Sequence, residues 1–380
     1  GIRERDKKFW QRSKSFYEFI SRFKSVPLVG GPAFAIFDYF QRISKFSPPR
    51  DLSKPNFVLK QTYKMMEKGW GKNFIKRLEK SDGSRPIVTT FSTIAFMAEF
   101  FRYPGEIFCL ICDTDISRSW APLEGGKSRI KYFAPTETSA SRLEMYGIKK
   151  ENVILAGHPL PLANVGKKGE QAAKDFQRRI PRLNPSKKQK DFLERKLGKI
   201  KEREGKPLAL MFAIGGGGAQ KQTGLEIMIS LAEKAKRSQV ALVFSVGTRD
   251  NLKDYFLKNA KKLGISQAVE IIFASNAETY FSRFNEKLKE VDILWTKPSE
   301  LCFFSALGLP LILSDPIGSQ EKRNREWVLE KGAALLQKNP RFCDKWLFEY
   351  LRKGLLAEAA INGFYNIDKL GREEIIKELL

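Results

Sequence analysis

Glycine and polar residues follow three apolar segments in the second half of the chain, at the points where each segment would end as a strand. The first group is "GGGGAQ" at 215–220, the second is "TKPSE" at 296–300, and the third is "PIGSQEKRN" at 316–324. The carboxyl ends of parallel strands share one edge of a sheet, where α/β proteins bind their ligands. We therefore expect the three groups to form one ligand site.

The four consecutive glycines would let main-chain amides approach a phosphate, and the helix predicted after them would add partial positive charge. A plain turn is the alternative for such a loop. The pattern is neither GxGxxG followed by a suitably placed acid nor GxxxxGK followed by Ser or Thr, so neither a dinucleotide-binding fold nor a P-loop is predicted. The candidate phosphate-contacting residues of this group are Gly215, Gly216, Gly217, Gly218 and Gln220.

The second and third groups carry side chains suited to sugar hydroxyls. Ser299 is placed to cap a helix and Glu300 to lie in its first turn, where a carboxylate is favourable. The functional alternative is that the Glu300 carboxylate accepts hydrogen bonds from both hydroxyls of a ribose. The candidate sugar-contacting and nucleotide-contacting residues of the two groups are Thr296, Lys297, Ser299, Glu300, Gln320, Glu321 and Asn324.

The elements that must position these residues alternate between short β-rich runs and helical patterns from about residue 85 onward, as in parallel sheets covered by helices. A chain of 380 residues exceeds the usual size of a single core, so we expect two α/β domains. The predicted domains are 1–160 and 207–380. Residues 161–206 are basic and poor in large apolar side chains, which predicts a linker with a surface helix.

The amino-terminal segment has aromatic and aliphatic residues at helical spacing over 7–24, with lysines and arginines between them. A similar pattern occurs over 33–45, and both stretches are predicted to be amphipathic helices. Such helices either pack on the domain core or lie on an anionic membrane, and one helix can do both. No apolar stretch approaches the roughly 18 residues of a membrane span, and no signal sequence is recognisable. We expect a cytoplasmic protein, peripheral on the inner face of the membrane.

The net charge of +25 favours an anionic partner such as nucleic acid, an acidic membrane surface or a phosphorylated substrate. No nucleic-acid-binding module is recognisable, so no nucleic acid is expected. Cys109 and Cys112 have CxxC spacing, but a second CxxC is missing and His158 is the single histidine. We therefore expect reduced, buried thiols and neither a metal nor a cofactor.

The three groups, in this order and spacing, resemble the donor half of GT-B glycosyltransferases. The closest likeness is to the group that contains the peptidoglycan N-acetylglucosaminyltransferase and monogalactosyldiacylglycerol synthase, with Ser299 in place of the usual glycine. The resemblance covers 208–334, and "NVILAGHPLP" at 152–161 extends it more thinly back to about residue 85. It implies two facing Rossmann-like domains with a nucleotide-sugar in the central cleft. It also implies that the glycines approach the diphosphate, Glu300 holds the ribose, and Gln320 and Glu321 hold the donor sugar, without a metal.

The family also opens with a strand and a glycine loop that ends in a histidine, which is often given as the catalytic base. Residues 1–84 contain no such loop, so either it lies upstream of Gly1 or catalysis is reassigned or lost. The replacements that the sequence offers are Asp113 and Asp115 in "CDTD", and His158 in "GHPLP". A helix cap for one aspartate and a structural role for a lone histidine are the alternatives.

Three functions follow from these observations. The first is a membrane-associated glycosyltransferase that moves a sugar from a nucleotide-sugar, with a UDP-sugar as the expected donor, to a lipid or lipid-linked acceptor. The second is a nucleotide-sugar epimerase or hydrolase on the same fold, which would need neither acceptor nor membrane. The third is a non-catalytic scaffold that binds an anionic membrane and keeps the glycine loop as a turn.

Overall fold

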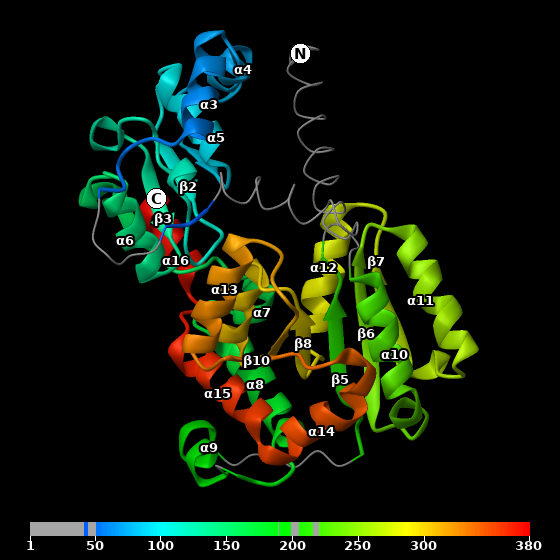
Figure 1. Ribbon diagram of the computed structural model, residues 1–380. Coiled ribbons are helices and arrows are strands. Elements are labelled where there is room, and N and C mark those ends of the chain that lie inside the picture. The colour runs from blue at the N-terminus through cyan, green and yellow to red at the C-terminus, as the bar shows by residue number, and fades with distance from the viewer. Residues whose placement is uncertain (1–41, 45–50, 189, 199–204, 216–219) are drawn as a thin grey trace. The chain divides into compact units, whose positions relative to one another are not determined.

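The computed structural model describes residues 42–44, 51–188, 190–198, 205–215 and 220–380 (Figure 1). This chain divides into two compact units. Of the described residues, the first unit contains those up to His158 together with 318–323 and 373–380, and the second contains those within 159–317 and 324–372. The helices predicted at 7–24 and 33–45 lie outside the described residues, apart from 42–44. No helix in the described part of the chain is long and apolar enough to cross a membrane.

The first unit is built on a four-stranded parallel sheet with the strand order β1-β2-β3-β4. The strands are β1 (Ile87–Thr89), β2 (Ile107–Leu110), β3 (Lys131–Ala134) and β4 (Val153–Leu155). Apolar runs bury the two inner strands almost completely, as expected for a parallel sheet with helices on its faces. All four strands lie in the region after residue 85 where the sequence predicts short β-rich runs.

Two helices precede β1, and two more lie between strands of this sheet. They are α3 (Phe57–Glu67), α4 (Lys72–Asp82), α5 (Ser92–Phe100) and α6 (Glu137–Met145), with short 3-10 turns η1 (Arg118–Trp120), η2 (Gly125–Lys127) and η3 (Lys150–Asn152). A capping box starts α6: Thr136 Oγ1 accepts from the Ser139 amide at 3.0 Å, and Ser139 Oγ accepts from the Thr136 amide at 3.3 Å.

The carboxyl-terminal helix α16 (Gly371–Leu379) brings the end of the chain into the first unit. Ile375 packs with Phe108, Phe133 and Ala156 in a small apolar cluster of that unit's sheet. From the sequence, this helix is expected in the domain 207–380. Sequence pattern alone could show that the helix has an apolar face, but not which sheet that face would cover.

The second unit is built on a six-stranded parallel sheet with the order β10-β9-β8-β5-β6-β7. Its strands are β5 (Leu208–Ala213), β6 (Val240–Gly247), β7 (Val269–Phe273), β8 (Ile293–Thr296), β9 (Leu311–Leu313) and β10 (Ala334–Leu336). Successive strands run outward from β5 to β7, and the chain then returns to place β8 on the other side of β5. The strand order therefore reverses between β5 and β8, which is the position where open α/β sheets bind ligands.

The helices of this unit pack around a core centred on aromatic side chains. They are α7 (Leu162–Val165), α8 (Glu170–Leu183), α9 (Lys190–Leu197), α10 (Lys221–Lys236), α11 (Asp250–Lys262), α12 (Ala277–Leu288), α13 (Ser319–Glu330), α14 (Cys343–Lys353) and α15 (Leu355–Asn366), with the 3-10 segments η4 (Ser266–Ala268), η5 (Glu300–Leu307) and η6 (Pro340–Phe342). Phe212 of β5 meets Trp295 of β8 edge-to-face, and Trp295 meets Trp346 of α14. Two parallel α/β sheets confirm the predicted fold class.

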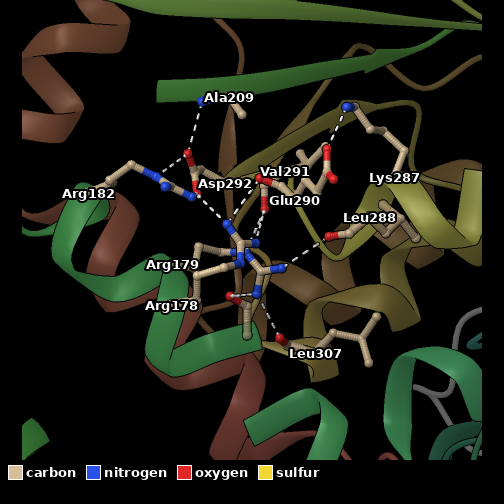
Figure 2. A network of polar contacts seen from close by, with 11 residues as sticks. Arg178, Arg179, Arg182, Ala209, Lys287, Leu288, Glu290, Val291, Asp292 and Leu307 are labelled. Atoms are coloured by element: carbon tan, nitrogen blue, oxygen red, sulfur yellow. Dashed lines mark hydrogen bonds and ion pairs between the residues drawn. The ribbon is translucent and has the colours of Figure 1, made fainter. Parts of the chain in front are cut away.

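Helix α8 lies in the segment that we expected to be a linker with a surface helix, yet one of its sides is buried in the second unit. Phe176, Ile180 and Leu183 join the core, and Arg179 is only 1% exposed. Arg179 donates to the main-chain oxygens of Val291 at 2.8 Å and of Leu307, Gly308 and Leu288 at 2.9 to 3.3 Å (Figure 2). Burial lowers the pKa of Arg179 to about 10, so the side chain stays cationic at neutral pH.

A second arginine of α8 anchors the start of the sheet. Arg182 donates to both carboxylate oxygens of Asp292, at 2.7 and 2.5 Å (Figure 2). Asp292 is fully buried and also accepts from the Ala209 amide at 2.9 Å. This ion pair joins α8 to the amino ends of β5 and β8, which is the end of the sheet opposite to the expected ligand site. The basic residues of this segment are thus partly internal and structural.

Candidate functional site

The reversal of strand order brings the first two sequence groups together at the carboxyl ends of β5 and β8. Gly215 follows β5 and Lys297 follows β8. A Cβ atom built on Gly215 would lie 3.4 Å from Cδ of Lys297, so the lysine stem lies beside the space where a side chain at 215 would be. The predicted convergence of these two groups is therefore present in the second unit.

Gln220 completes this contact and starts helix α10. The same Cβ position on Gly215 lies 3.9 Å from Oε1 of Gln220. Gln220 is only 7% exposed, and its Oε1 has no hydrogen-bond partner among the residues that the structure describes. A buried acceptor without a partner is costly, so this atom marks a place for a ligand hydroxyl or N–H group. Gly216, Gly217 and Gly218 lie outside the described residues.

Arg249, which the sequence analysis did not single out, also reaches the first glycine. It follows β6, the other neighbour of β5, and its Nη1 donates to the main-chain oxygen of Gly215 at 3.2 Å. Tyr280 of α12 lies within electrostatic range of both Arg249 and Glu300. We call Gly215, Gln220, Arg249, Lys297 and Glu300 the strand-end cluster.

Tyr280 adds a half-buried side chain beside this cluster. It shares a 2.6 Å hydrogen bond with Ser245 Oγ of β6, and Ser245 is fully buried. Burial raises the pKa of Tyr280, the Glu300 carboxylate adds to the rise, and Arg249 opposes it. A tyrosine seven residues after a strand has no distinctive sequence signal, so only the structure reveals this neighbour.

The "TKPSE" turn itself is held by local hydrogen bonds. Ser299 Oγ accepts from the Leu301 amide at 3.3 Å, which makes Ser299 the cap of η5. Asn324 is 1% exposed and donates to the Pro298 oxygen at 3.3 Å. Ser299 and Asn324 therefore shape the turn, whereas Glu300 stands exposed in its first turn. Thr296 is 2% exposed at the end of β8.

In the first unit, Asp115 is engaged in a buried ion pair. Arg142 donates to its two carboxylate oxygens at 2.9 and 2.8 Å, and the Ile116 amide donates at 2.8 Å. Arg142 is fully buried and Asp115 is 3% exposed. A carboxylate held by two charge-assisted bonds is poorly suited to accept a substrate proton. Asp115 therefore forms a buried ion pair of the first unit, whereas it was expected as a candidate base.

Asp113 lies two residues earlier in a different environment. It is half-buried, and the side-chain amide of Gln320 donates to its Oδ2. Segment 318–323 belongs to the first unit, so Gln320 and the half-buried Glu321 lie in that unit. Asp113 was expected as a base and Gln320 as a sugar contact. The two side chains are hydrogen-bonded to each other although they lie far apart in the sequence.

His158 is the last residue of the first unit and follows β4. It is partly buried, and removal from water lowers the pKa of its imidazole to about 4. The ring is therefore neutral at pH 7. Of the two cysteines with CxxC spacing, Cys109 is fully buried in β2 and burial raises its pKa, while Cys112 is half-buried. Among the described residues, no group of three acidic, cysteine or histidine side chains is arranged to hold a metal ion.

Comparison with known proteins finds similarity at the level of fold. No protein-family model and no curated protein matches the chain. A structure described as the UDP complex of S. aureus MnaA is 13% identical, with a TM-score of 0.51 over 86% of this chain and 82% of that one. A UDP-GlcNAc 2-epimerase from Neisseria meningitidis, bound to UDP-GlcNAc, is 15% identical, with a TM-score of 0.51 over 86% of this chain and 82% of that one. The chain therefore has a GT-B-like fold of two Rossmann-like domains.

Proposed function

We propose that this protein is an enzyme that binds a UDP-sugar at the strand-end cluster and transfers the sugar to a lipid or lipid-linked acceptor at a membrane surface. The observation that carries the proposal is the convergence of Gly215, Gln220 and Lys297 at the switch point between β5 and β8. The sequence resemblance to GT-B glycosyltransferases supports transfer as the reaction. The two solved structures of similar fold, described with UDP and UDP-GlcNAc, support the choice of nucleotide.

In this proposal the acceptor hydroxyl attacks the anomeric carbon, the bond from that carbon to the diphosphate breaks, and UDP leaves. The cations of the strand-end cluster stabilise the charge that develops on the leaving diphosphate. The hydroxyl proton passes to a base, for which Asp113 is the candidate, because Asp115 is held by Arg142. His158 is the other candidate, because burial lowers the pKa of its imidazole to about 4 and the neutral ring can accept a proton at pH 7.

A second candidate is a nucleotide-sugar epimerase or hydrolase. The specific observation in its favour is that the Neisseria structure of similar fold is described as an epimerase. The two candidates differ in their need for an acceptor. An epimerase isomerises or cleaves the nucleotide-sugar alone, whereas a transferase releases UDP only when acceptor lipid is present.

The first experiment measures thermal unfolding with UDP, other nucleoside diphosphates and their sugar conjugates. A ligand at about 100 times its Kd stabilises the folded protein by roughly 2.7 kcal/mol. We expect a shift with uridine nucleotides that Glu300→Gln weakens, while Glu278→Gln, an exposed carboxylate at the start of α12, leaves it unchanged. A wild-type protein that none of the nucleotides stabilises would instead support the non-catalytic scaffold.

The second experiment separates the two reactions. Radiolabelled UDP-sugar is incubated with the protein, with and without anionic vesicles that contain an extract of membrane lipids. Label that enters the lipid fraction supports transfer. Isomerised or hydrolysed sugar in the vesicle-free sample would contradict transfer and support the second candidate.

A further inference from the structure

The two helices that precede β1 carry a regular row of lysines. A lysine occupies every fourth position along α3, the turn after it and α4, namely Lys60, Lys64, Lys68, Lys72, Lys76 and Lys80. Arg77 adds a seventh cation, and Glu67 and Glu79 are the acidic residues between 57 and 80. With seven cations and two carboxylates, the segment 57–80 has a net charge of +5.

All seven cations lie on the outward sides of their helices. Leu59, Tyr63 and Met66 of α3 are buried in the core of the first unit, and so is Ile75 of α4. The basic residues occupy the other sides of the two helices, and each of them is exposed. Both helices pack against α5 (Figure 1), so the charged sides are turned away from the core. We call the seven side chains the basic surface of α3 and α4.

This arrangement of charge is unfavourable for the two helices themselves. Lysines four residues apart on a helix repel each other, as Lys60 and Lys64 do on α3 and Lys72 and Lys76 do on α4. Lys72 also occupies the first position of α4, where the helix dipole disfavours a cation. Within the part of the chain that the structure describes, none of the seven cations forms an ion pair. An anionic partner outside the protein would relieve this repulsion.

The choice between lipid and nucleic acid as that partner depends on Phe57 and on the shape of the surface. Phe57 lies on the same side of α3 as Lys60 and Lys64, and it is 62% exposed. An anionic bilayer attracts lysines, and a phenylalanine among them gains by leaving water for the acyl boundary. Single-stranded nucleic acid is instead held in basic grooves with several stacking aromatic rings. The outward sides of two helices are convex, which favours the lipid surface.

We infer that the basic surface of α3 and α4 docks this protein on an anionic lipid bilayer. The inference rests on the proposed function for the reason to dock, and it assigns the membrane contact to described residues of the first unit. From the sequence, that contact is expected at 7–24 and 33–45, and α3 begins after both segments. Each lysine close to an anionic bilayer strengthens binding about 5-fold, so three lysines together contribute about 100-fold.

The test measures how the full chain partitions onto vesicles. The protein is sedimented with vesicles of phosphatidylglycerol mixed equally with phosphatidylcholine, and with vesicles of phosphatidylcholine alone. The first variant of α3 combines Lys60→Gln, Lys64→Gln and Lys68→Gln. The matched control combines Lys258→Gln, Lys261→Gln and Lys262→Gln. These control lysines are exposed near the carboxyl end of α11 and form no ion pair among the described residues, so both variants lose the same charge.

We expect the wild type to bind anionic vesicles and not neutral ones, and added salt should weaken the binding. The α3 variant should bind anionic vesicles about 100-fold more weakly, and the control variant should bind like the wild type. A wild type that ignores anionic vesicles would overturn the inference. An equal loss in the two variants would also overturn it, because binding would then follow the net charge and not this surface.

The midpoint of thermal unfolding shows whether the variants fold. If the α3 variant is unfolded, a variant of α4 takes its place, with Lys72→Gln, Lys76→Gln and Lys80→Gln. A random single-stranded oligonucleotide tests the other partner. Weaker oligonucleotide binding by the α3 variant, with vesicle binding unchanged, would overturn the inference in favour of nucleic acid.

Calorimetric titration with UDP separates the docking surface from the proposed function. The α3 variant should bind UDP like the wild type, because its substitutions lie in the first unit and the strand-end cluster lies in the second. A wild type that binds anionic vesicles through α3 but does not bind UDP would support the docking surface while the proposed function fails. UDP binding without any binding to vesicles would overturn the docking surface alone.

Discussion

The two aspartates of "CDTD" lie in different surroundings. We therefore expect their substitution by asparagine to have different effects. Asp113→Asn should fold normally and lower the rate of sugar transfer while leaving UDP affinity unchanged, because the amide cannot take up a proton. Asp115→Asn should instead lower the free energy of unfolding by about 3 kcal/mol or more, because it leaves the fully buried Arg142 without its counter-charge. Denaturant unfolding and turnover of UDP-sugar measure the two effects.

The control for this pair is Asp250→Asn, an exposed aspartate at the start of α11 whose contact to Lys253 lies at the surface. It should change neither property by more than a small amount. Equal destabilisation by the Asp113 and Asp115 variants would contradict the separate roles that their contacts indicate.

His158 gives the chain a specific dependence on pH. Its pKa is about 4 in the folded protein and near 6.5 in an unfolded chain. Between these values the unfolded state holds more protons, so the free energy of unfolding is fully retained above pH 6.5 and falls as the pH is lowered toward 4. The loss should reach about 3 kcal/mol, from 1.36 kcal/mol for each unit of pKa shift.

Because His158 is the single histidine, one variant isolates this effect. Chemical unfolding between pH 4 and 7 is measured for the wild type and for His158→Asn. The free energy of unfolding of the wild type relative to the variant should rise from pH 4 to about pH 6.5 and level off above it. Parallel curves at all pH values would show that the imidazole titrates normally in the folded protein.

At the scale of elements, α8 depends on a cation that was expected to face water. Arg179→Met removes the donors for four main-chain oxygens around η5 and β8. We expect the free energy of unfolding to fall by about 3 kcal/mol or more, because buried oxygens without partners each cost roughly 1 to 3 kcal/mol. Arg195→Met on the exposed side of α9 is the control. If Arg179→Met is as stable as the wild type, the apolar contacts of α8 alone are enough to keep it packed in the second unit.

Most strands could be predicted individually from the sequence, but their order within the sheets could not. Runs such as "PLALMFAI" and "QVALVFSVG" identify β5 and β6 because buried parallel strands are continuously apolar. The three-residue β10 was not predicted, although β1 and β4 have the same length and were. The reversal between β5 and β8 depends on tertiary contacts, so sequence could suggest that the strand ends meet but not that β6 would bring Arg249 to them.

Candidate site residues could be predicted from the sequence where a motif marks the end of a strand. They could not be predicted where the role of a residue depends on its partner in the folded protein. Gly215, Gln220 and Lys297 meet as expected. Arg179 carried a usable signal, since it occupies the apolar side of α8 with Phe176, Ile180 and Leu183 at helical spacing. The pairing of Asp115 with Arg142 carried no such signal, because 27 positions separate the two residues and neither lies in a recognisable pattern.

At the scale of the whole molecule, each unit has a hydrophobic core of its own. A ligand that binds one unit should stabilise that unit first. Hydrogen exchange followed by mass spectrometry should show that UDP slows exchange in peptides from β5, β8 and η5. Peptides from β2 and β3 of the first unit serve as the internal control. Equal protection in both sets would contradict a site confined to the strand-end cluster.

Not all of the cations behind the net charge of +25 lie at the surface of the protein. Arg118, Arg142 and Arg179 are almost completely buried and bind carbonyl or carboxylate oxygens of the protein itself. The charge available to an anionic surface is therefore smaller than composition alone suggests. Vesicle binding that falls with added salt would support a docking role for the remaining cations.

The placement of α16 has a consequence for synthesis in the cell. During translation, Phe108, Phe133 and Ala156 are synthesised long before Ile375, the residue that packs with them. At 5 to 20 residues per second, the interval over the intervening two hundred or so residues is roughly 10 to 40 s. During that time the nascent first unit exposes an uncovered apolar surface, which chaperones would recognise. A stop codon before residue 373 would make that exposure permanent, and the truncated chain should accumulate in the insoluble fraction.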